Sequence, residues 1–313
     1  LDQASAVLEL MRAVAVTPDL TSYNATISAC APSGDVGRAL ALLNELCQEA
    51  LRPDIVSYNS AMNTCRRDGR WEQALQLLEA ACKAMLVPNF ISYVAAIDAC
   101  SGEQWERALG LLHTMAVVSI AANVVPYNSA IGACSKAGKA ERAILLLEEM
   151  VAAQLRPDLK SYCSAINACA KEGWSTSAME LLATLQNDGL RPDVPLCNSV
   201  ISACAAGGHV ERAMALLHGM REERMEPDTI SYNSMISACS KGGQWERAFD
   251  VVEAMTAVVV EPNLISYSTA IAACEKDGQW ECALALLDRI REAGLEPNVI
   301  AHNAAVSACG KGG

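Results

Sequence analysis

A proline followed by aspartate or asparagine recurs through the sequence at a nearly fixed interval. Successive pairs lie 35 residues apart, except across one gap of 69 residues that holds two units; they begin at Pro18, Pro53, Pro88, Pro157, Pro192, Pro227, Pro262 and Pro297. Internal periods of about 20–50 residues are the signature of repeat proteins, in which each repeat contacts only its neighbours. The period therefore overrides the expectation of two ordinary domains that a chain of 313 residues would give.

The period divides the chain into eight full units between two partial ones. Residues 1–19 are the end of an earlier unit, and residues 299–313 are the beginning of a further one. One full unit is a residue short and carries Ala122-Asn123 in place of the proline pair. We predict a single array over residues 1–313, with full units at 20–54, 55–89, 90–123, 124–158, 159–193, 194–228, 229–263 and 264–298.

Each unit is predicted to form two helices. In the unit 229–263 the first helix should end near Gly242-Gly243, and the second should run from Trp245 towards Pro262, because proline cannot continue a helix. Hydrophobic residues make up 52% of the chain but aromatic residues only 4%, so alanine and leucine, which favour helices, supply the apolar mass. The expected fold class is all-α, a right-handed α-solenoid superhelix of helix-turn-helix repeats.

Two stripes run along the first helix of each unit, counting positions from the first residue of the unit. Positions 1, 4, 8 and 11 share one stripe, which is expected to pack, and positions 2, 5 and 9 share a neighbouring stripe, which is expected to stay open. Stacked units bury a core that no unit could bury alone, and they form an extended concave surface. Alanine at position 20 should let adjacent helices approach closely; it is present as Ala39, Ala74, Ala108, Ala143, Ala178, Ala213, Ala248 and Ala283.

These features resemble the pentatricopeptide repeat family over the whole chain. The similarity lies in the 35-residue period, the Ser-Tyr-Asn opening, the Lys-x-Gly turn and the closing Pro-Asp. The related tetratricopeptide repeat, whose groove typically takes peptides, has a period of about 34 residues and a glycine at position 8. Position 8 here is never glycine: it is Ile27, Met62, Ile97, Ile131, Ile166, Ile201, Ile236, Ile271 and Val306.

The resemblance implies that the protein reads RNA, with one unit for each base. In the family, position 5 and the last residue of the unit form the reading pair. The corresponding pairs are Asn24/Asp54, Asn59/Asn89, Val94/Asn123, Asn128/Asp158, Cys163/Asp193, Asn198/Asp228, Asn233/Asn263 and Ser268/Asn298, and Asn303 opens a ninth. By the family's rule, Asn/Asp favours U, Asn/Asn a pyrimidine and Ser/Asn A, so the expected site is 5′-U-Y-N-U-N-U-Y-A-3′; Val94 and Cys163 depart from the reading set.

The resemblance also implies that a valine or isoleucine at position 2 packs on the faces of the bases. These residues are Val56, Ile91, Val125, Ile230, Ile265 and Ile300, with departures at Thr21, Lys160 and Pro195. Asparagine and aspartate are short and carry several donors and acceptors, which suits the edge of a splayed base held by stacking. A single asparagine near a helix start would be unremarkable; its repetition at one phase favours a functional role.

Basic residues recur at position 13, as Arg67, Lys136, Lys171, Lys241, Lys276 and Lys311. They could balance the dipole at a helix C-terminus or contact phosphates, and the sequence leaves both open. The net charge is −12, although the first 14 positions of the nine first-helix segments carry eight basic and six acidic residues. The acid is therefore concentrated on the second helices and linkers, which form the convex side in the family. Screening over about 8 Å separates it from the groove, and it could serve protein partners.

No catalytic, cofactor or metal site is expected. Of 14 cysteines, nine lie at position 11 and are interpreted as small buried residues of a reducing compartment: Cys30, Cys65, Cys100, Cys134, Cys169, Cys204, Cys239, Cys274 and Cys309. His209-Val210-Glu211 matches half of a zinc deaminase signature but lacks the required Cys-x-x-Cys, so we reject a catalytic role for it. The five tryptophans open second helices and are interpreted as packing residues.

The stretch from Ala108 to Ser135 has no charged residue and is long enough to suggest a membrane span. It contains His113, Asn123 and Pro126 and keeps the register of the repeats, so we predict no membrane segment. No signal or transit peptide is visible. Because the chain begins at Leu1 and stops at Gly313 within a repeat, we expect it to be a piece of a longer protein.

The function predicted from these patterns is sequence-selective binding of single-stranded RNA, without enzymatic activity. The family resemblance implies a mitochondrial or chloroplast protein that acts in RNA processing, stability, editing or translation. Two alternatives stay open. One is a helical-repeat scaffold that binds protein, which the acidic net charge favours. The other is the targeting arm of a larger RNA-processing enzyme.

Overall fold

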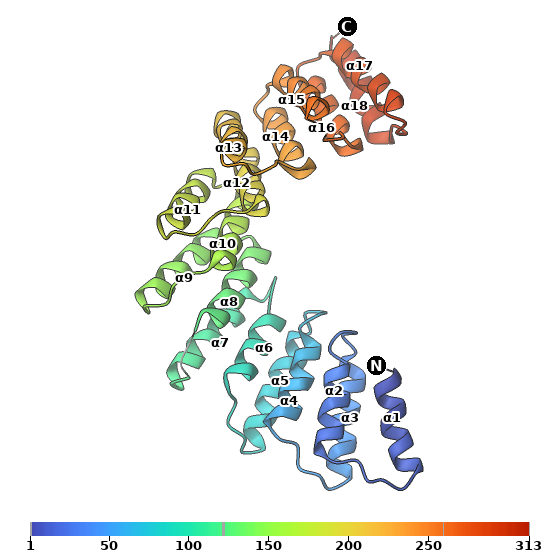
Figure 1. Ribbon diagram of the computed structural model, residues 1–313, viewed down its shortest axis with the longest axis vertical. Coiled ribbons are helices and arrows are strands. Elements are labelled where there is room, and N and C mark those ends of the chain that lie inside the picture. Colours follow the sequence, from blue (N-terminus) through green and yellow to red (C-terminus); the bar gives the residue numbers. More distant parts are fainter. Residues whose placement is uncertain (1, 121–122, 259, 313) are drawn as a thin grey trace. The chain divides into compact units, whose positions relative to one another are not determined.

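The computed structural model describes residues 2–120, 123–258 and 260–312. Ala122 and the ends of the predicted array at Leu1 and Gly313 lie outside these ranges. Throughout the described ranges the secondary structure is helical, with 18 α-helices and no strand (Figure 1). The chain is an all-α solenoid of helical hairpins. We number the full predicted repeats one to eight along the chain, starting at residue 20.

The chain packs as two compact units, residues 1–157 and 158–313, and each is described by itself. The N-terminal unit contains α1 (Asp2–Ala13), α2 (Leu20–Ala29), α3 (Val36–Gln48), α4 (Ile55–Cys65), α5 (Trp71–Lys83), α6 (Phe90–Ala99), α7 (Trp105–Val117), α8 (Val124–Ala137) and α9 (Ala140–Ala152). The C-terminal unit contains α10 (Leu159–Glu172), α11 (Ser175–Asn187), α12 (Val194–Ala206), α13 (Val210–Glu222), α14 (Thr229–Lys241), α15 (Trp245–Ala257), α16 (Leu264–Lys276), α17 (Trp280–Glu292) and α18 (Val299–Gly312).

The first helix of each repeat begins where the last residue of the preceding repeat caps it. At α14, for example, the Asp228 carboxylate accepts a hydrogen bond of 2.9 Å from the Ser231 backbone N–H, and the Ser231 hydroxyl accepts one from the Asp228 N–H. Such caps satisfy donors that the first helical turn leaves without partners and contribute about 1 kcal/mol each. The residue predicted to read a base is therefore also the residue that starts the next helix.

Within each unit, the first helices of successive repeats form a continuous row. In the C-terminal unit α10, α12, α14, α16 and α18 pack one on the next, and α2, α4, α6 and α8 do so in the N-terminal unit (Figure 1). Within each unit, the second helices α3, α5, α7, α11, α13, α15 and α17 each pack between the first helix of their own repeat and the next first helix. Across the described residues, second helices do not pack on one another. The row of first helices is thus the closely packed face of each unit.

The predicted packing stripe forms the core. Tyr23, Ile27 and Cys30 at positions 4, 8 and 11 of repeat one are fully buried. The equivalent residues of the other full repeats are buried except Tyr127, which is half-buried, as are the residues at position 1. The alanines at position 20 are also fully buried in all eight repeats. A larger side chain there would push neighbouring helices apart, because protein interiors are close-packed.

Eight of the nine cysteines at position 11 are buried, and Cys309 is partly exposed. All 14 cysteines are free thiols. Burial raises the pKa of the Cys134 thiol to about 11 and that of Cys274 to about 12, so these groups stay protonated at neutral pH. They act as small apolar core residues.

The uncharged stretch from Ala108 to Ser135 is divided between α7 and α8 rather than forming one long helix. Among the described residues no helix combines the length and apolar character needed to cross a bilayer. His209 directly precedes α13 as its N-cap residue, without a side-chain cap hydrogen bond, and Glu211 lies in the first turn of that helix. The described residues also hold no cluster of three or more histidine, cysteine or acidic side chains suited to a metal ion.

Candidate nucleic-acid interface

In four repeats the asparagine at position 5 donates a hydrogen bond to the last residue of the same repeat. The last residue belongs to the next first helix as its cap, so the bond joins two adjacent helices in the row. The Nδ2-to-Oδ1 distances are 3.2 Å for Asn24–Asp54, 3.1 Å for Asn59–Asn89, 3.0 Å for Asn198–Asp228 and 3.5 Å for Asn233–Asn263. The sequence-predicted reading pairs are therefore brought together in these repeats.

A serine at position 3 of the following repeat completes a trio that the sequence analysis missed. The Ser231 hydroxyl donates to Asn198 Oδ1 at 2.5 Å and accepts from the Asp228 backbone N–H at 3.1 Å. Ser92 and Ser266 make the same bond to the asparagine that precedes them, each at 2.6 Å. Each trio thus takes one residue from the first helix of its repeat and two from the start of the next.

The predicted open stripe is more open at position 2 than at position 5. Asn59 and Asn198 are each only 6% exposed, because the next first helix covers them, whereas Asn24 and Asn233 are half-buried. The expectation that positions 2, 5 and 9 form one open stripe is therefore wrong at Asn59 and Asn198. The burial restricts any contact with a ligand to the edge of the amide group.

Two of the aspartate caps, Asp54 and Asp228, have a lowered pKa and stay ionised at neutral pH. Burial by itself would raise the pKa of Asp228, but hydrogen bonds from the Ser231 backbone N–H and the Asn198 amide outweigh it and hold the pKa below its ordinary value. Asp54 has a lowered pKa for the same balance of reasons, with Ser57 and Asn24 as donors. An ionised carboxylate only accepts hydrogen bonds, whereas an asparagine cap also offers an N–H.

The side chains at position 2 form an exposed apolar ladder along each unit. Their exposed fractions range from 47% to 67%, at Val125, Val56, Ile91, Ile230, Ile265 and Ile300. Apolar side chains exposed at a fixed phase, each near a polar pair, are available to pack against the flat face of a ligand. Position 2 is also where the family resemblance predicts contacts with the faces of the bases.

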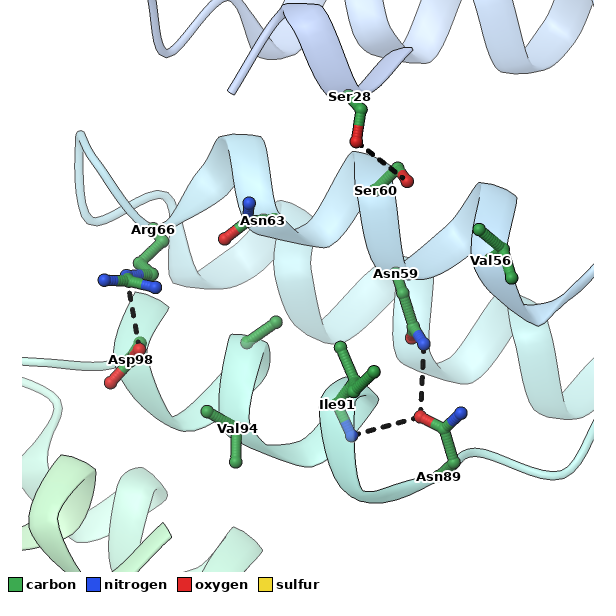
Figure 2. A pocket seen from close by; sticks show the side chains of 11 residues that line it. Ser28, Val56, Asn59, Ser60, Asn63, Arg66, Asn89, Ile91, Val94 and Asp98 are labelled. Carbon is green, nitrogen blue, oxygen red and sulfur yellow. Dashed lines mark hydrogen bonds and ion pairs between the residues drawn. The ribbon is translucent and has the colours of Figure 1, made fainter. Parts of the chain in front are cut away.

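A pocket of about 350 Å³ opens at repeat two, between side chains of α2, α4 and α6. Val56 and Ile91 line it with the pair Asn59–Asn89 (Figure 2). The Arg66–Asp98 ion pair, with an N-to-O distance of 3.2 Å, lies at the opposite end of the view. The pocket therefore joins apolar surface, two amides and a paired charge within one repeat interval; the sequence analysis did not identify the ion pair.

Among the described residues, three predicted pairs lack the bond between position 5 and the cap, and in repeat one the pair is present without the serine bond to Asn24. Val94 has no polar atom to offer Asn123, which caps α8 through the Val125 N–H at 2.9 Å. Asp193 caps α12 through the Leu196 N–H, and Cys163 contacts Asn167 instead.

The third is in repeat eight, where the buried Ser268 hydroxyl oxygen has no hydrogen-bond partner among the described residues. Asn298 caps α18 through the Ala301 N–H at 2.9 Å. Of the remaining predicted readers, Asn128 lies on α8 in the N-terminal unit and Asp158 caps α10 in the C-terminal unit. Asn303 is exposed on α18.

The six basic residues at position 13 are all exposed, near the C-terminal ends of the first helices. They follow position 5 by eight residues, or about 12 Å along a helix. Some already have contacts within the protein. Lys276 donates to the Ser240 carbonyl at 2.6 Å, and Lys311 forms an ion pair of 3.2 Å with Glu275. Lys136 donates to the Ser101 hydroxyl at 3.0 Å.

Comparison with protein families identifies the repeat. The pentatricopeptide repeat domain model matches residues 1–33 and 180–242, and the PPR repeat family model matches 18–67, 122–171 and 227–276. The PPR repeat model matches 56–83, 160–190 and 265–295. The chain belongs to the pentatricopeptide repeat family. Between the matched segments, only residues 84–121 are not covered, and they include most of the short repeat three.

Solved pentatricopeptide repeat structures share this fold. The chain is similar to pentatricopeptide repeat protein PPR10 in complex with an 18-nt psaJ RNA element, with a TM-score of 0.83 and 24% identity over 98% of this chain and 45% of that one. For PPR10 from maize the TM-score is 0.58 and the identity 22%, over 99% and 50%. The chain thus spans about half the length of these relatives. No curated protein sequence matched it in a separate comparison.

Proposed function

We propose that this pentatricopeptide repeat protein is a sequence-selective binder of single-stranded RNA, in which one repeat addresses one base. The observation that carries the proposal is the recurrence of the asparagine–cap pair beside an exposed aliphatic side chain at position 2. The pocket at repeat two shows both components lining one space. The apolar ladder supplies packing for base faces, and the pairs supply donors and acceptors for base edges.

The atoms left unused by the protein suggest how a base is read. In repeat six, Asp228 Oδ1 accepts from the Ser231 N–H and from Asn198, so Oδ2 is the acceptor that remains for a ligand. An acceptor at this point suits the N3–H group of uracil. In repeat seven the cap is Asn263, whose Oδ1 is occupied in the same way and whose Nδ2 is a donor. A donor there is compatible with the N3 or O2 acceptor of a pyrimidine.

Single strands are favoured over duplexes for a geometric reason. Base edges in an RNA duplex face each other or lie in a groove that side chains do not reach. Short side chains that are largely buried between helices, as Asn59 and Asn198 are, can contact only a base that has been brought to them.

The decisive experiment is selection from a random pool of RNA, followed by sequencing of the bound fraction. We expect enrichment of 5′-U-Y-N-U-N-U-Y-A-3′, with the N-terminal repeat at the 5′ end. A hairpin that buries the same sequence in a stem should compete poorly. Enrichment of a G-rich motif, or equal competition by the hairpin, would contradict readout by these pairs.

A second candidate is a scaffold that binds protein, and the net charge of −12 is the observation that favours it. Salt dependence distinguishes the two. About four to six phosphate contacts through the position-13 cations should give a log–log slope of roughly −3 to −4 for RNA affinity. A slope near zero, with no enriched RNA motif, would favour the scaffold.

The family resemblance further supports a site of action in mitochondria or chloroplasts, on RNA processing, stability, editing or translation. We propose a binding role without catalysis for this chain; if it is the targeting arm of a larger enzyme, the same reading surface would select that enzyme's substrate. Fractionation of cells that express the full-length protein, followed by sequencing of the RNA that copurifies from the organelle, tests both points. Recovery of the protein from the cytosol without RNA would count against them.

A further inference from the structure

We propose that the serine at position 3 of the following repeat is a positioning residue for base selection, so that readout needs three side chains rather than two. The proposal rests on the RNA-binding function proposed above. It concerns Ser57, Ser92, Ser231 and Ser266, all of them fully buried.

The hydrogen bonds of one trio show how the serine acts. The Ser231 hydroxyl accepts from the Asp228 N–H at 3.1 Å and lies 2.5 Å from Asn198 Oδ1, against 3.0 Å from Asp228 Oδ1. A hydroxyl has one proton to donate, and the shorter distance favours Asn198 as its acceptor. Ser92 repeats the pattern, at 2.6 Å from Asn59 Oδ1 and 3.2 Å from Asn89 Oδ1.

This bond determines which way the asparagine amide faces. Asp228 Oδ1 accepts from the Ser231 backbone N–H and therefore has only lone pairs to offer Asn198. If the Asn198 amide turned over, two oxygens would face each other and the serine proton would lose its acceptor. The Nδ2 group is thus held towards the cap, with its second N–H not used by any of these contacts. That N–H is a donor of fixed direction beside the cap atom that remains for a base.

Repeat one has the same three residue types, but the bond from the serine to the asparagine is missing among the described residues. Ser57 donates to Asp54 at 2.9 Å, and Asn24 Oδ1 is buried with no partner among the described residues. A buried acceptor without a donor costs about 1–3 kcal/mol. In the repeats with a complete trio, the equivalent serine supplies this bond.

The sequence carries the same association independently of the geometry. Every full repeat with asparagine at position 5 is followed by serine at position 3: Asn24 and Ser57, Asn59 and Ser92, Asn128 and Ser161, Asn198 and Ser231, Asn233 and Ser266. Every full repeat with another residue there is followed by a residue without a hydroxyl: Val94 and Pro126, Cys163 and Leu196, Ser268 and Ala301. A serine needed only as part of a helix cap would have no reason to follow the residue 33 positions before it.

The first test removes one serine and measures selectivity at one base. Ser231→Ala should reduce the ratio of affinities for U and C at the sixth base by at least about fivefold, within the range expected for loss of a well-made polar base contact. Ratios at the other bases should not change. Ser231→Thr, which keeps the hydroxyl, should restore the ratio.

Ser22→Ala is the matched control. Ser22 occupies the same cap position and donates to Asp19 Oδ1 from its N–H and its hydroxyl at 2.8 Å each, but among the described residues it forms no capping box and bonds to no position-5 asparagine. It should lower the melting temperature less than Ser231→Ala, which also leaves the buried Asn198 Oδ1 without its donor, and it should leave every selectivity ratio unchanged. If Ser231→Ala keeps its ratio while folded, or if Ser22→Ala alters a ratio equally, the positioning role is wrong.

A second test adds the bond in repeat eight and does not depend on tolerance of the first variant. Ser268→Asn alone would place an amide oxygen near Ala301, whose side chain has no donor. Adding Ala301→Ser to this change should raise the pyrimidine preference at the eighth base at least about fivefold over the single change. Equal ratios for the single and double variants would overturn the proposal. If the unmodified protein bound no single-stranded RNA, the proposed function itself would fail, which is a distinct result.

Discussion

Repeats six and eight have the same two-helix backbone but present different polar groups at the same phase. In repeat six, Asn198 is held between Asp228 and Ser231 by bonds of 3.0 and 2.5 Å. In repeat eight, Ser268 occupies the equivalent place and its hydroxyl oxygen has no partner among the described residues. Both repeats nevertheless end in a side chain that caps the next helix.

The difference shows that capping and base selection can be separated, although they share a residue. A cap needs only the last residue of a repeat and a backbone N–H, which Ala301 supplies to Asn298 as well as Ser231 does to Asp228. Selection, by our proposal, also needs an asparagine and a hydroxyl. Repeat eight therefore keeps the fold of repeat six without its fixed donor.

The largest expected effect comes from converting repeat eight into repeat six. Ser268→Asn, Asn298→Asp and Ala301→Ser together should change the preference at the eighth base from A to U, with a shift in the affinity ratio of at least about tenfold, because a good polar base contact discriminates by about 1–3 kcal/mol. The same three residue types already occupy these positions in repeat six. Both proteins are to be titrated with both oligonucleotides at one salt concentration.

The other seven bases are the internal control for this conversion, because each is read locally. The helical content of the variant should match that of the parent by circular dichroism. An unchanged preference at the eighth base in a folded, helical variant would show that these side chains do not read it.

Next in size is the contribution of the apolar ladder, which should affect affinity and not selectivity. Ile300 is 67% exposed at position 2 of the helix that follows repeat eight. Ile300→Ala should weaken binding about three- to tenfold, at the lower end of the range for base stacking. The loss should be equal for A and U at the eighth base. The control is Met85→Ala, at a residue that is 90% exposed and outside the ladder, and it should leave affinity unchanged. A change in the A-to-U ratio for Ile300→Ala would show that the ladder also contributes to selectivity.

A smaller effect is expected from the cations at position 13. Lys241→Gln should lower affinity about two- to threefold near physiological salt and reduce the slope against log salt by about 0.7, the value for one phosphate contact in a single strand. Lys311 is already paired with Glu275 at 3.2 Å, so Lys311→Gln should change the slope less. Fluorescence anisotropy at four or more salt concentrations measures both, and equal slopes for both variants and the parent would assign these residues to the helix dipole alone.

The smallest expected effect is a difference in the pH dependence of stability between aspartate caps and asparagine caps. The pKa of Asp228 is below its ordinary value in the folded protein, so the cap stabilises the fold fully above the unfolded pKa near 4 and loses that stabilisation as pH falls through the lower, folded value. Because Asp228 is exposed to solvent on one side, screening limits the contribution to about a few tenths of a kcal/mol. Denaturant unfolding at pH 7 and pH 3 should show a smaller acid-induced loss of stability for Asp228→Asn than for the parent protein. The control is Asn263→Asp, and an equal acid-induced loss for the two variants would contradict the lowered pKa of Asp228.

The repeat boundaries follow from the sequence because local chemistry sets them. Pro227 cannot continue a helix and Asp228 caps the next one, so α14 begins at Thr229, the first residue of the predicted unit. Position 5 was more difficult. Periodicity places Asn198 on the same stripe as the exposed position 2, but the next helix of the row covers it. Such covering depends on packing between repeats, which a pattern within one repeat does not contain.

The serine was missed for a related reason. Within its own repeat Ser231 looks like part of a Ser-Tyr-Asn helix opening, and its partner Asn198 is 33 residues earlier. The association of asparagine at position 5 with serine at position 3 of the next repeat was visible in the sequence. Only the hydrogen bond between the two side chains explains it. The Arg66–Asp98 ion pair has the same origin, since it joins positions 12 and 9 of successive repeats.

The way the trio crosses a repeat boundary bears on how such arrays can be duplicated or recombined. Exchange of residues 194–228 would transfer Asn198 and Asp228 but leave Ser231 behind, and the incoming pair would meet whatever residue the recipient carries at position 3. A cassette of residues 197–231 has the same length and transfers all three together. The heritable unit of specificity is therefore offset by three residues from the unit of folding. A gene duplication whose breakpoints fall between positions 3 and 5 would copy the asparagine, its cap and its serine together.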